Sequence, residues 1–309
     1  MRVLAALIAL LVTSEPLPVV SGFSRTVAET VGASGFSRTE PAPRPFQSPQ
    51  RIISLIPAVT EMLFAIGAGP QVVAVSSFDR YPPEVEQLQR VGALIDPDVE
   101  RILSLRPDLV AIFGSQTNLR AQLERAHIQV FAYTDEGLAD IANTMRAIGI
   151  RVGRAQSGES AARDLEARIA AARKRVSGAV KPKTLIVFGR EPLTLRGIYA
   201  SGGLGFVHDM VEAAGGANVF GDIQRKAVQA TTEQILARLP EVILELRSNP
   251  LAPETRRREI AAWRPLAALP AVRNTRVYIL GDPRTVIPGP RIAEAIELIA
   301  ETLHPEAFR

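Results

Sequence analysis

The sequence predicts an α/β protein of two similar lobes, with mainly parallel sheets, joined by a long rigid bridging helix. Short apolar segments alternate with amphipathic ones along residues 51–309, which is typical of parallel sheets covered by helices. One long amphipathic stretch, residues 155–176, lies between two such series. The series after this stretch resembles the series before it, which predicts a duplicated lobe.

The N-terminus predicts export from the cytoplasm. Met1 and Arg2 supply a positive start, and Val3 to Val12 form an apolar run that is too short to span a bilayer. We therefore expect a signal peptide over residues 1–22, with an unplaced cleavage point, and a periplasmic protein. Residues 23–50 are rich in Pro, Ser, Gly and Thr and lack apolar periodicity, which predicts a disordered linker.

The first lobe is expected over residues 51–150. Pro57 suits the first position of a helix, and Gly67 suits a helix end. Two prolines exclude regular structure from residues 77–83. The expected strands are residues 51–55, 72–75, 109–113 and 129–132, and the expected helices are residues 60–66, 98–105, 119–126 and 138–148.

The bridging helix is expected within residues 151–181. Leu165, Ile169, Ala172 and Val176 recur at steps of three and four and so form one apolar stripe. At 1.5 Å per residue this helix would span about 33 Å, roughly the diameter of a domain. Because bending it would break backbone hydrogen bonds, we expect the lobes to move little when a ligand binds.

The second lobe is expected over residues 182–309. Residues 100–110 align without a gap on residues 233–243, and both segments place an acidic residue after a proline. This match supports two related lobes, although a helix, a proline and a strand are also a common joint. The expected strands are residues 184–188, 242–246 and 277–280, and the expected helices are residues 205–214, 232–239 and 292–303.

Composition excludes several kinds of site. The chain of 309 residues is 47% hydrophobic and 22% charged, as expected of a globular protein with a sizeable core. It has no cysteine, which excludes disulfides and thiolate metal sites. The net charge of +4 is spread over scattered arginines with few aromatics among them, so we expect no nucleic-acid partner. We expect a monomer.

Catalytic and metal motifs are weak. The three histidines are isolated in sequence, so no metal site is expected. Ser201, His208 and Asp209 offer the residue types of a hydrolase triad, but adjacent His and Asp side chains point in different directions on a helix. A secreted α/β hydrolase stays open as an alternative, but we expect no enzyme activity.

Two loops at predicted helix starts could present backbone N–H groups to an anion, namely residues 56–58 and 200–203. Arg190, Arg196 and Arg284 could add positive charge beside such an anion.

Five segments carry a family resemblance, namely RIISLIPAVTEMLFAIGAG, VSSFDRYPPEV, DPDVERILSLRPDLV, GFVHDMVEAAGGANVF and TTEQILARLPEVIL. They resemble the helical-backbone (class III) periplasmic substrate-binding proteins of ABC importers. They are most similar to the cobalamin-binding members, whereas other members take up haem or iron siderophores. The resemblance implies a receptor that clamps a corrinoid between two lobes and delivers it to an ABC permease dimer. Haem or a ferric siderophore is the alternative ligand, and no cofactor of the protein's own is implied.

The resemblance also implies functional residues. Phe78 and Tyr81 keep the family's aromatics, whereas Leu94 and Ala227 stand where cobalamin-binding members have tryptophans. Further apolar faces could come from Phe113, Phe188 and Tyr199. The expected ligand-binding residues are Phe78, Tyr81, Leu94, Arg190, Tyr199, Ser201, Asp282 and Arg284.

Two glutamates, one in each repeat, are expected to dock on the permease. Glu100 and Glu233 occupy equivalent positions near the start of a helix, and the resemblance implies that such a pair binds arginines of the permease. The simpler explanation is that an acid in the first turn stabilises the helix dipole.

Overall fold

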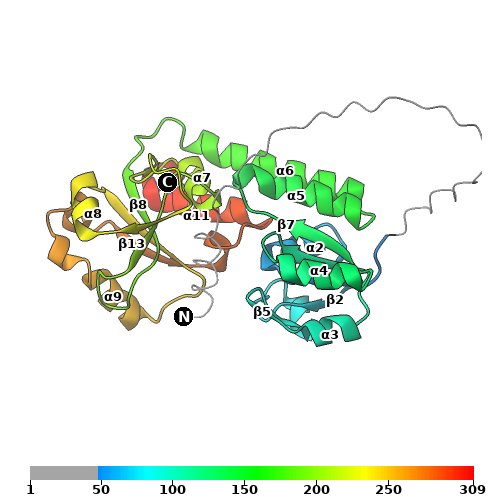
Figure 1. Ribbon diagram of the computed structural model, residues 1–309. Coiled ribbons are helices and arrows are strands. Elements are labelled where there is room, and N and C mark those ends of the chain that lie inside the picture. Colours follow the sequence, from blue (N-terminus) through cyan, green and yellow to red (C-terminus); the bar gives the residue numbers. More distant parts are fainter. Residues whose placement is uncertain (1–47) are drawn as a thin grey trace, which may run out of the picture.

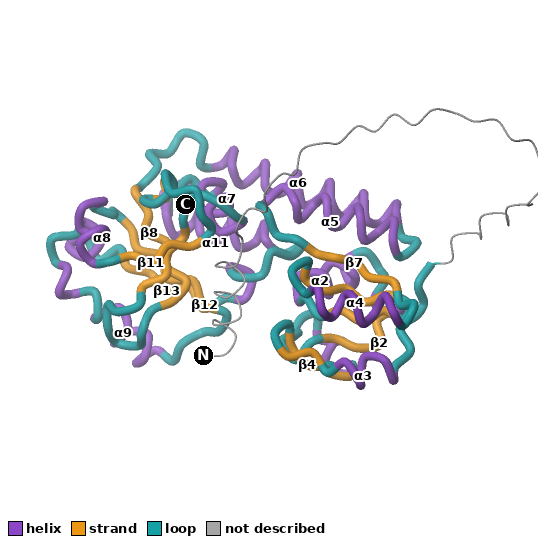
Figure 2. Tube along the Cα trace, in the orientation of Figure 1, coloured by secondary structure: helices purple, strands orange, loops and turns teal. Residues whose placement is uncertain are grey.

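The computed structural model describes residues 48–309. The predicted signal peptide and residues 23–47 of the predicted linker lie outside the described residues. Figure 1 shows two lobes side by side, with helices α5 (Leu138–Arg151) and α6 (Ala155–Arg175) passing from one lobe to the other. Each lobe contains its own sheet (Figure 2), so the α/β fold class predicted from the sequence is confirmed.

The sheet of the first lobe is entirely parallel, in the order β3-β2-β1-β6-β7. Ile52 and Ile53 in its central strand are completely buried, as expected of an apolar run in a sheet covered on both faces. The strands are β1 (Ile52–Ser54), β2 (Val72–Val75), β3 (Gln89–Arg90), β6 (Leu109–Phe113) and β7 (Gln129–Tyr133), and the helices are α2 (Pro57–Ala65), α3 (Val99–Ser104) and α4 (Thr117–Arg125).

A small antiparallel hairpin stands apart from this sheet. It consists of β4 (Gly92–Ala93) and β5 (Asp96–Pro97), with Leu94 and Ile95 at its tip. The sequence did not predict this hairpin, because two-residue strands leave no periodic pattern to recognise.

The sheet of the second lobe is mixed, in the order β11-β9-β8-β12-β13, with β10 beside β8. Strands β8, β12 and β13 are parallel, whereas β9 is antiparallel to both β8 and β11. The strands are β8 (Lys183–Gly189), β9 (Ile198–Ser201), β10 (Ala217–Asn218), β11 (Ala227–Ala230), β12 (Val242–Arg247) and β13 (Val277–Gly281). The helices are α7 (Phe206–Ala213), α8 (Thr232–Arg238), α9 (Pro253–Ala261), α10 (Pro270–Arg273) and α11 (Ile292–Leu303).

The bridge is a pair of helices rather than one. Helix α6 matches the predicted stretch, and α5 packs along it while α11 and α7 of the second lobe pack on the pair. Gly149 and Gly158 lie against each other at a close contact of α5 and α6, since a Cβ on Gly158 would lie 2.7 Å from the carbonyl oxygen of Met145. One continuous cluster of buried side chains includes both helices and parts of both lobes, so the joint is part of the core.

The duplication predicted from the sequence appears as matching structure. Helix α3 leads through Pro107 into β6, and α8 leads through Pro240 into β12. The two similar helices α2 and α7 both end at glycines with positive φ, Gly67 at 76° and Gly215 at 82°. Within residues 48–309, no helix is both long enough and apolar enough to cross a membrane.

Candidate functional site

The carboxyl ends of the parallel strands in each lobe face the other lobe. Tyr81 follows β2, Asp135 follows β7 and Arg291 follows β13, and each of the three contacts a residue of the opposite lobe. In open α/β sheets ligands bind outside the carboxyl ends of the strands. The interlobe junction is therefore the candidate site.

The loop after β2 carries the two predicted aromatic residues and is held by a buried carboxylate. Asp79 is 1% exposed and accepts a hydrogen bond of 2.9 Å from the backbone N–H of Ser76. Arg90 donates to the carbonyl oxygens of Ser76 and Asp79, at 3.0 and 2.8 Å. Burial raises the pKa of Asp79 to about 6. Phe78 is half-buried and Tyr81 is exposed on this fixed loop.

Tyr81 lies against an ion pair that joins the lobes. Arg291 donates two hydrogen bonds to Glu61, from Nε at 2.9 Å and from Nη2 at 2.5 Å. The guanidinium carbon of Arg291 lies 3.8 Å from the centroid of the Tyr81 ring. Burial raises the pKa of Glu61, and the Arg291 partner opposes that shift. Glu61 and Tyr81 belong to the first lobe and Arg291 to the second.

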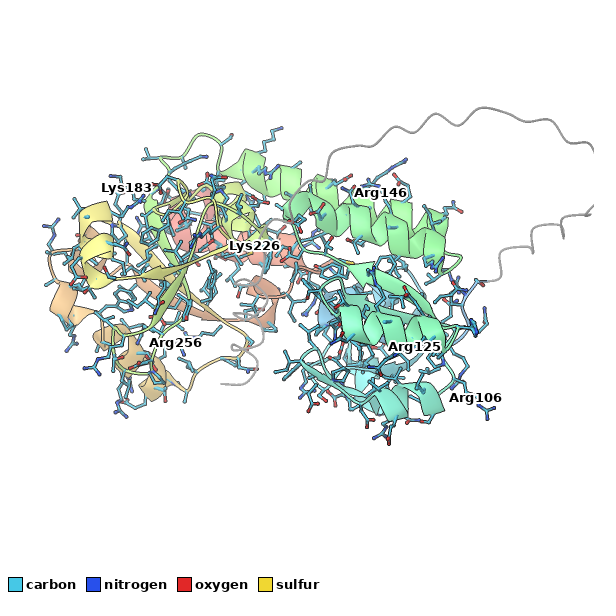
Figure 3. All side chains as sticks on the ribbon, in the orientation of Figure 1. Arg106, Arg125, Arg146, Lys183, Lys226 and Arg256 are labelled. Carbon is cyan, nitrogen blue, oxygen red and sulfur yellow. The ribbon has the colours of Figure 1, made fainter. Side chains whose placement is uncertain are left out.

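A second set of contacts joins the lobes at the start of α5. Asp209 of α7 accepts a hydrogen bond of 2.9 Å from the backbone N–H of Leu138, so the second lobe caps a helix that begins beside the first. Lys226, labelled in Figure 3, donates to the backbone carbonyl of Asp135 and lies 4.0 Å from Glu136. Burial raises the pKa of the Asp135 carboxyl to about 6, although Lys226 opposes that shift.

Arg190 was predicted to bind ligand, and its position corrects that prediction. Its side chain is fully buried, and its guanidinium contacts Glu245 at 2.8 Å and Glu259 at 2.9 Å. It also donates to the carbonyl oxygens of Thr194 and Glu259. With its donors taken by protein acceptors, Arg190 is an internal anchor of the loop after β8 rather than a ligand contact.

Ser201 and its loop also differ from the prediction. Ser201 is completely buried, and its hydroxyl donates to the carbonyl oxygen of Gly202 at 3.0 Å. The backbone N–H groups of Gly202 and Gly203 donate to Lys226 and Ile223, at 3.3 and 2.7 Å. These groups are therefore used in backbone pairing, and neither the anion loop nor the serine nucleophile is formed here.

Asp282 and Arg284 lie at the end of β13 but satisfy each other. The Nε of Arg284 donates to Asp282 at 3.0 Å, and its Nη1 donates to Glu294 at 2.9 Å. The Arg284 guanidinium lowers the pKa of Asp282. The charges of Asp282 and Arg284 are therefore paired within the second lobe.

The remaining predicted residues lie at separate places on the two lobes. Leu94 is half-buried at the hairpin tip, where its carbonyl oxygen accepts a hydrogen bond of 2.7 Å from Gln116. Tyr199 is half-buried in β9. Phe113 packs edge-on against Tyr133, with ring centroids 5.9 Å apart.

Glu100 and Glu233 are both exposed in the first turn of a helix, one in α3 and one in α8. The helix caps themselves are supplied by neighbours, Asp98 for α3 and Thr231 for α8. Hydrogen bonding to its own backbone N–H, with help from Thr231, lowers the pKa of Glu233. Both side chains are thus accessible at equivalent places in the two repeats.

Two hollows are lined by residues other than those that join the lobes. One of about 370 Å³ lies in the second lobe, beside Arg276, Tyr278 and His304. The other, of about 290 Å³, lies between β7 and α5 in the first lobe. Among residues 48–309, no group of three or more His, Asp or Glu side chains is placed to hold a metal ion.

Sequence reasoning missed the two residues that link the lobes most directly. Arg291 looked like one arginine among many, and Glu61 like an ordinary helix residue. One signal was available for Glu61: its neighbours Ala58, Val59, Met62 and Leu63 are apolar all round the helix, so a charge there has to be buried. A buried carboxylate requires a partner.

A comparison with protein families identifies one match. A family model described as periplasmic binding protein matches residues 52–283 of the chain. The match begins at β1 and ends just after β13, so it includes the sheets of both lobes and the helix pair between them.

Individual proteins show the same likeness. The vitamin B12-binding protein of Pectobacterium carotovorum is 29% identical over 257 residues, which are 82% of this chain and 90% of that protein. The uncharacterized ABC transporter substrate-binding lipoprotein YvrC of Bacillus subtilis is 28% identical over 268 residues, 85% of this chain and 82% of that protein. The structure of the periplasmic heme-binding protein RhuT from Roseiflexus sp. RS-1 in apo form is 28% identical, with a TM-score of 0.72, and covers 84% of this chain and 99% of that one.

Proposed function

Because the chain belongs to the periplasmic binding protein family, whose members are substrate receptors and not enzymes, we propose that it is an extracytoplasmic receptor for a metal-chelating macrocycle. It is exported by the N-terminal signal peptide, works as a monomer in the periplasm, and delivers its ligand to an ABC permease dimer. The first candidate ligand is a corrinoid and the second is haem.

The exposed ring of Tyr81 at the junction is the main reason to propose a flat ligand held between the lobes. Tyr81 stands 42% exposed at the junction, on a loop fixed by the buried Asp79. Phe78 lies on the same loop. A rigid aromatic surface at the carboxyl ends of two sheets suits the apolar face of a macrocycle.

Two observations keep haem as the second candidate. The tryptophan positions of cobalamin-binding members carry Leu94 and Ala227 here, which removes two flat side chains. Among solved structures, the chain is as similar to a heme-binding protein as to a vitamin B12-binding protein, at 28% and 27% identity. The hydrolase alternative has no support, since the hydroxyl of Ser201 is buried and bonded to the backbone.

Phe78→Ala is expected to weaken macrocycle binding by about 1–3 kcal/mol, because stacking against a desolvated ring is lost. The measurement is an absorption titration of the purified protein with cyanocobalamin, cobinamide and haemin. Phe308→Ala is the matched control, because the Phe308 ring packs against Arg175 at the end of α6 and makes none of the junction contacts described above. Equal affinities of wild type and Phe78→Ala would remove Phe78 from the site, and no binding of any probe to wild type would refute the proposed function.

Replacing both Glu100 and Glu233 by alanine is expected to leave ligand binding intact and to weaken docking on the permease. A twofold permease needs one equivalent charge on each lobe, and exposed carboxylates steer encounter and fix register. The measurement is complex formation with the cognate permease at rising salt, which should weaken the wild-type complex. The control replaces the exposed Glu124 and Glu301 instead. Normal uptake by the Glu100→Ala/Glu233→Ala variant at limiting receptor would show that the two glutamates only start helices.

A further inference from the structure

Three side chains at the junction lie in contact one after another, from the buried Glu61 through Arg291 to the exposed Tyr81. Glu61 comes from α2, Tyr81 from the loop after β2, and Arg291 from the residue before α11. The side chain of Glu61 is 2% exposed and that of Arg291 is 16% exposed, whereas residue Tyr81 is 42% exposed. The guanidinium therefore lies between a buried carboxylate and an exposed ring.

The carboxylate fixes the orientation of the guanidinium. Two parallel hydrogen bonds, at 2.9 and 2.5 Å, join the planar fork of Arg291 to Glu61. A bidentate pair of this kind restricts the plane of the guanidinium as well as its position. Glu61 is itself locked in place, because an unpaired carboxylate at this depth would be costly.

The guanidinium in turn covers one face of the Tyr81 ring. A separation of 3.8 Å from the guanidinium carbon to the ring centroid is direct contact, within the range of cation–π attraction. Arg291 covers this face only, so it leaves the opposite face and the ring edges uncovered, and residue Tyr81 as a whole is 42% exposed.

We propose that Glu61 and Arg291 are positioning residues that hold Tyr81 as a fixed platform, with its free face open to a flat ligand. This inference rests on the proposed function for the class of ligand, a metal-chelating macrocycle. A ring that is already held loses little freedom on binding, which strengthens binding by about threefold to tenfold relative to a mobile ring.

The platform is completed only when the lobes are in the arrangement described here. The ring and the carboxylate come from the first lobe, and the guanidinium comes from the second, 230 residues from Glu61. Other cations near the junction have different roles: Arg284 binds Asp282 and Glu294, and Lys226 binds the segment after β7.

The first experiment measures the ring directly, without ligand. The protein is labelled with 3-fluorotyrosine, and the Tyr81 fluorine resonance is assigned among the four tyrosines from Tyr81→Phe. Arg291→Gln is expected to shift and narrow this resonance, Arg291→Lys to shift it less, and the control Arg284→Gln to leave it unchanged. An unchanged Tyr81 resonance in Arg291→Gln would overturn the claim that Arg291 holds the ring.

The second experiment is a double-mutant cycle with haemin and cyanocobalamin as probes. Arg291→Gln is expected to weaken binding about threefold to tenfold when Tyr81 is present, and less than about twofold in a Tyr81→Ala background. A purely structural salt bridge would cost the same in both backgrounds, and that result would overturn the proposal.

One further variant is a control for misfolding. Glu61→Gln/Arg291→Gln removes the guanidinium without leaving a buried carboxylate unpaired, and its affinity for both probes is measured with and without Tyr81→Ala. If wild type binds neither probe, the proposed function fails, whereas the fluorine measurement still decides whether Arg291 holds the ring.

Discussion

Arg190→Ala is expected to lower the free energy of unfolding by about 3–5 kcal/mol, because it leaves buried carboxylates without their partner. The Arg190 side chain is fully buried against Glu245 and Glu259, which are 2% and 4% exposed. Glu245 also accepts hydrogen bonds from Trp263 and Arg247, at 2.6 and 2.9 Å. The change would therefore disturb a network that ties β8, β12 and α9 together.

The measurement for Arg190→Ala is urea unfolding followed by circular dichroism. Arg196→Ala is the matched control, since Arg196 is exposed in the same loop and its loss should cost less than about 0.5 kcal/mol. If Arg190→Ala were as stable as wild type but had lost its affinity for ligand, Arg190 would be a ligand contact, as the sequence suggested.

Gly158→Val is expected to lower the free energy of unfolding by about 3 kcal/mol, because the helix pair has no room for a side chain there. A Cβ on Gly158 would lie 2.7 Å from the carbonyl oxygen of Met145 and 3.1 Å from the Cα of Gly149. Both atoms belong to the backbone of α5, so the helices themselves would have to separate.

Thermal and urea unfolding of Gly158→Val test this packing. Gly178→Val is the control, because nothing lies within 4 Å of a Cβ on Gly178, which follows α6 in an exposed turn. Equal stability of the two variants would mean that α5 and α6 are not packed at this crossing, and the bridge would then be less rigid than described.

Local patterns in the sequence were sufficient to predict most helices and strands of the first lobe and helix α6 of the bridge. Apolar runs predicted β1 and β6, Pro57 marked the start of α2, and the periodic stripe of α6 gave its length. Strands β9 and β11 were missed, because they are short, antiparallel and built partly from small residues such as Ala200 and Ala227. Their pairing depends on distant segments, and a local pattern does not contain that information.

The site was less predictable than the fold, because charges are assigned to partners only by the three-dimensional structure. Arg190 was expected to add positive charge beside a ligand, but its partners Glu245 and Glu259 lie 55 and 69 residues away in the sequence. Arg291 resembled a surface residue, but its partner lies 230 residues away. The loop with Phe78 and Tyr81 could be predicted, since the prolines and aromatics that define it are adjacent in sequence.

Backbone hydrogen exchange, measured with and without the tightest-binding probe among cyanocobalamin, cobinamide and haemin, tests whether one ligand is held between the lobes. We expect ligand to protect residues 76–81 of the first lobe and residues 282–291 of the second together. Protection confined to one hollow, either that beside Tyr278 and His304 or that between β7 and α5, would contradict it.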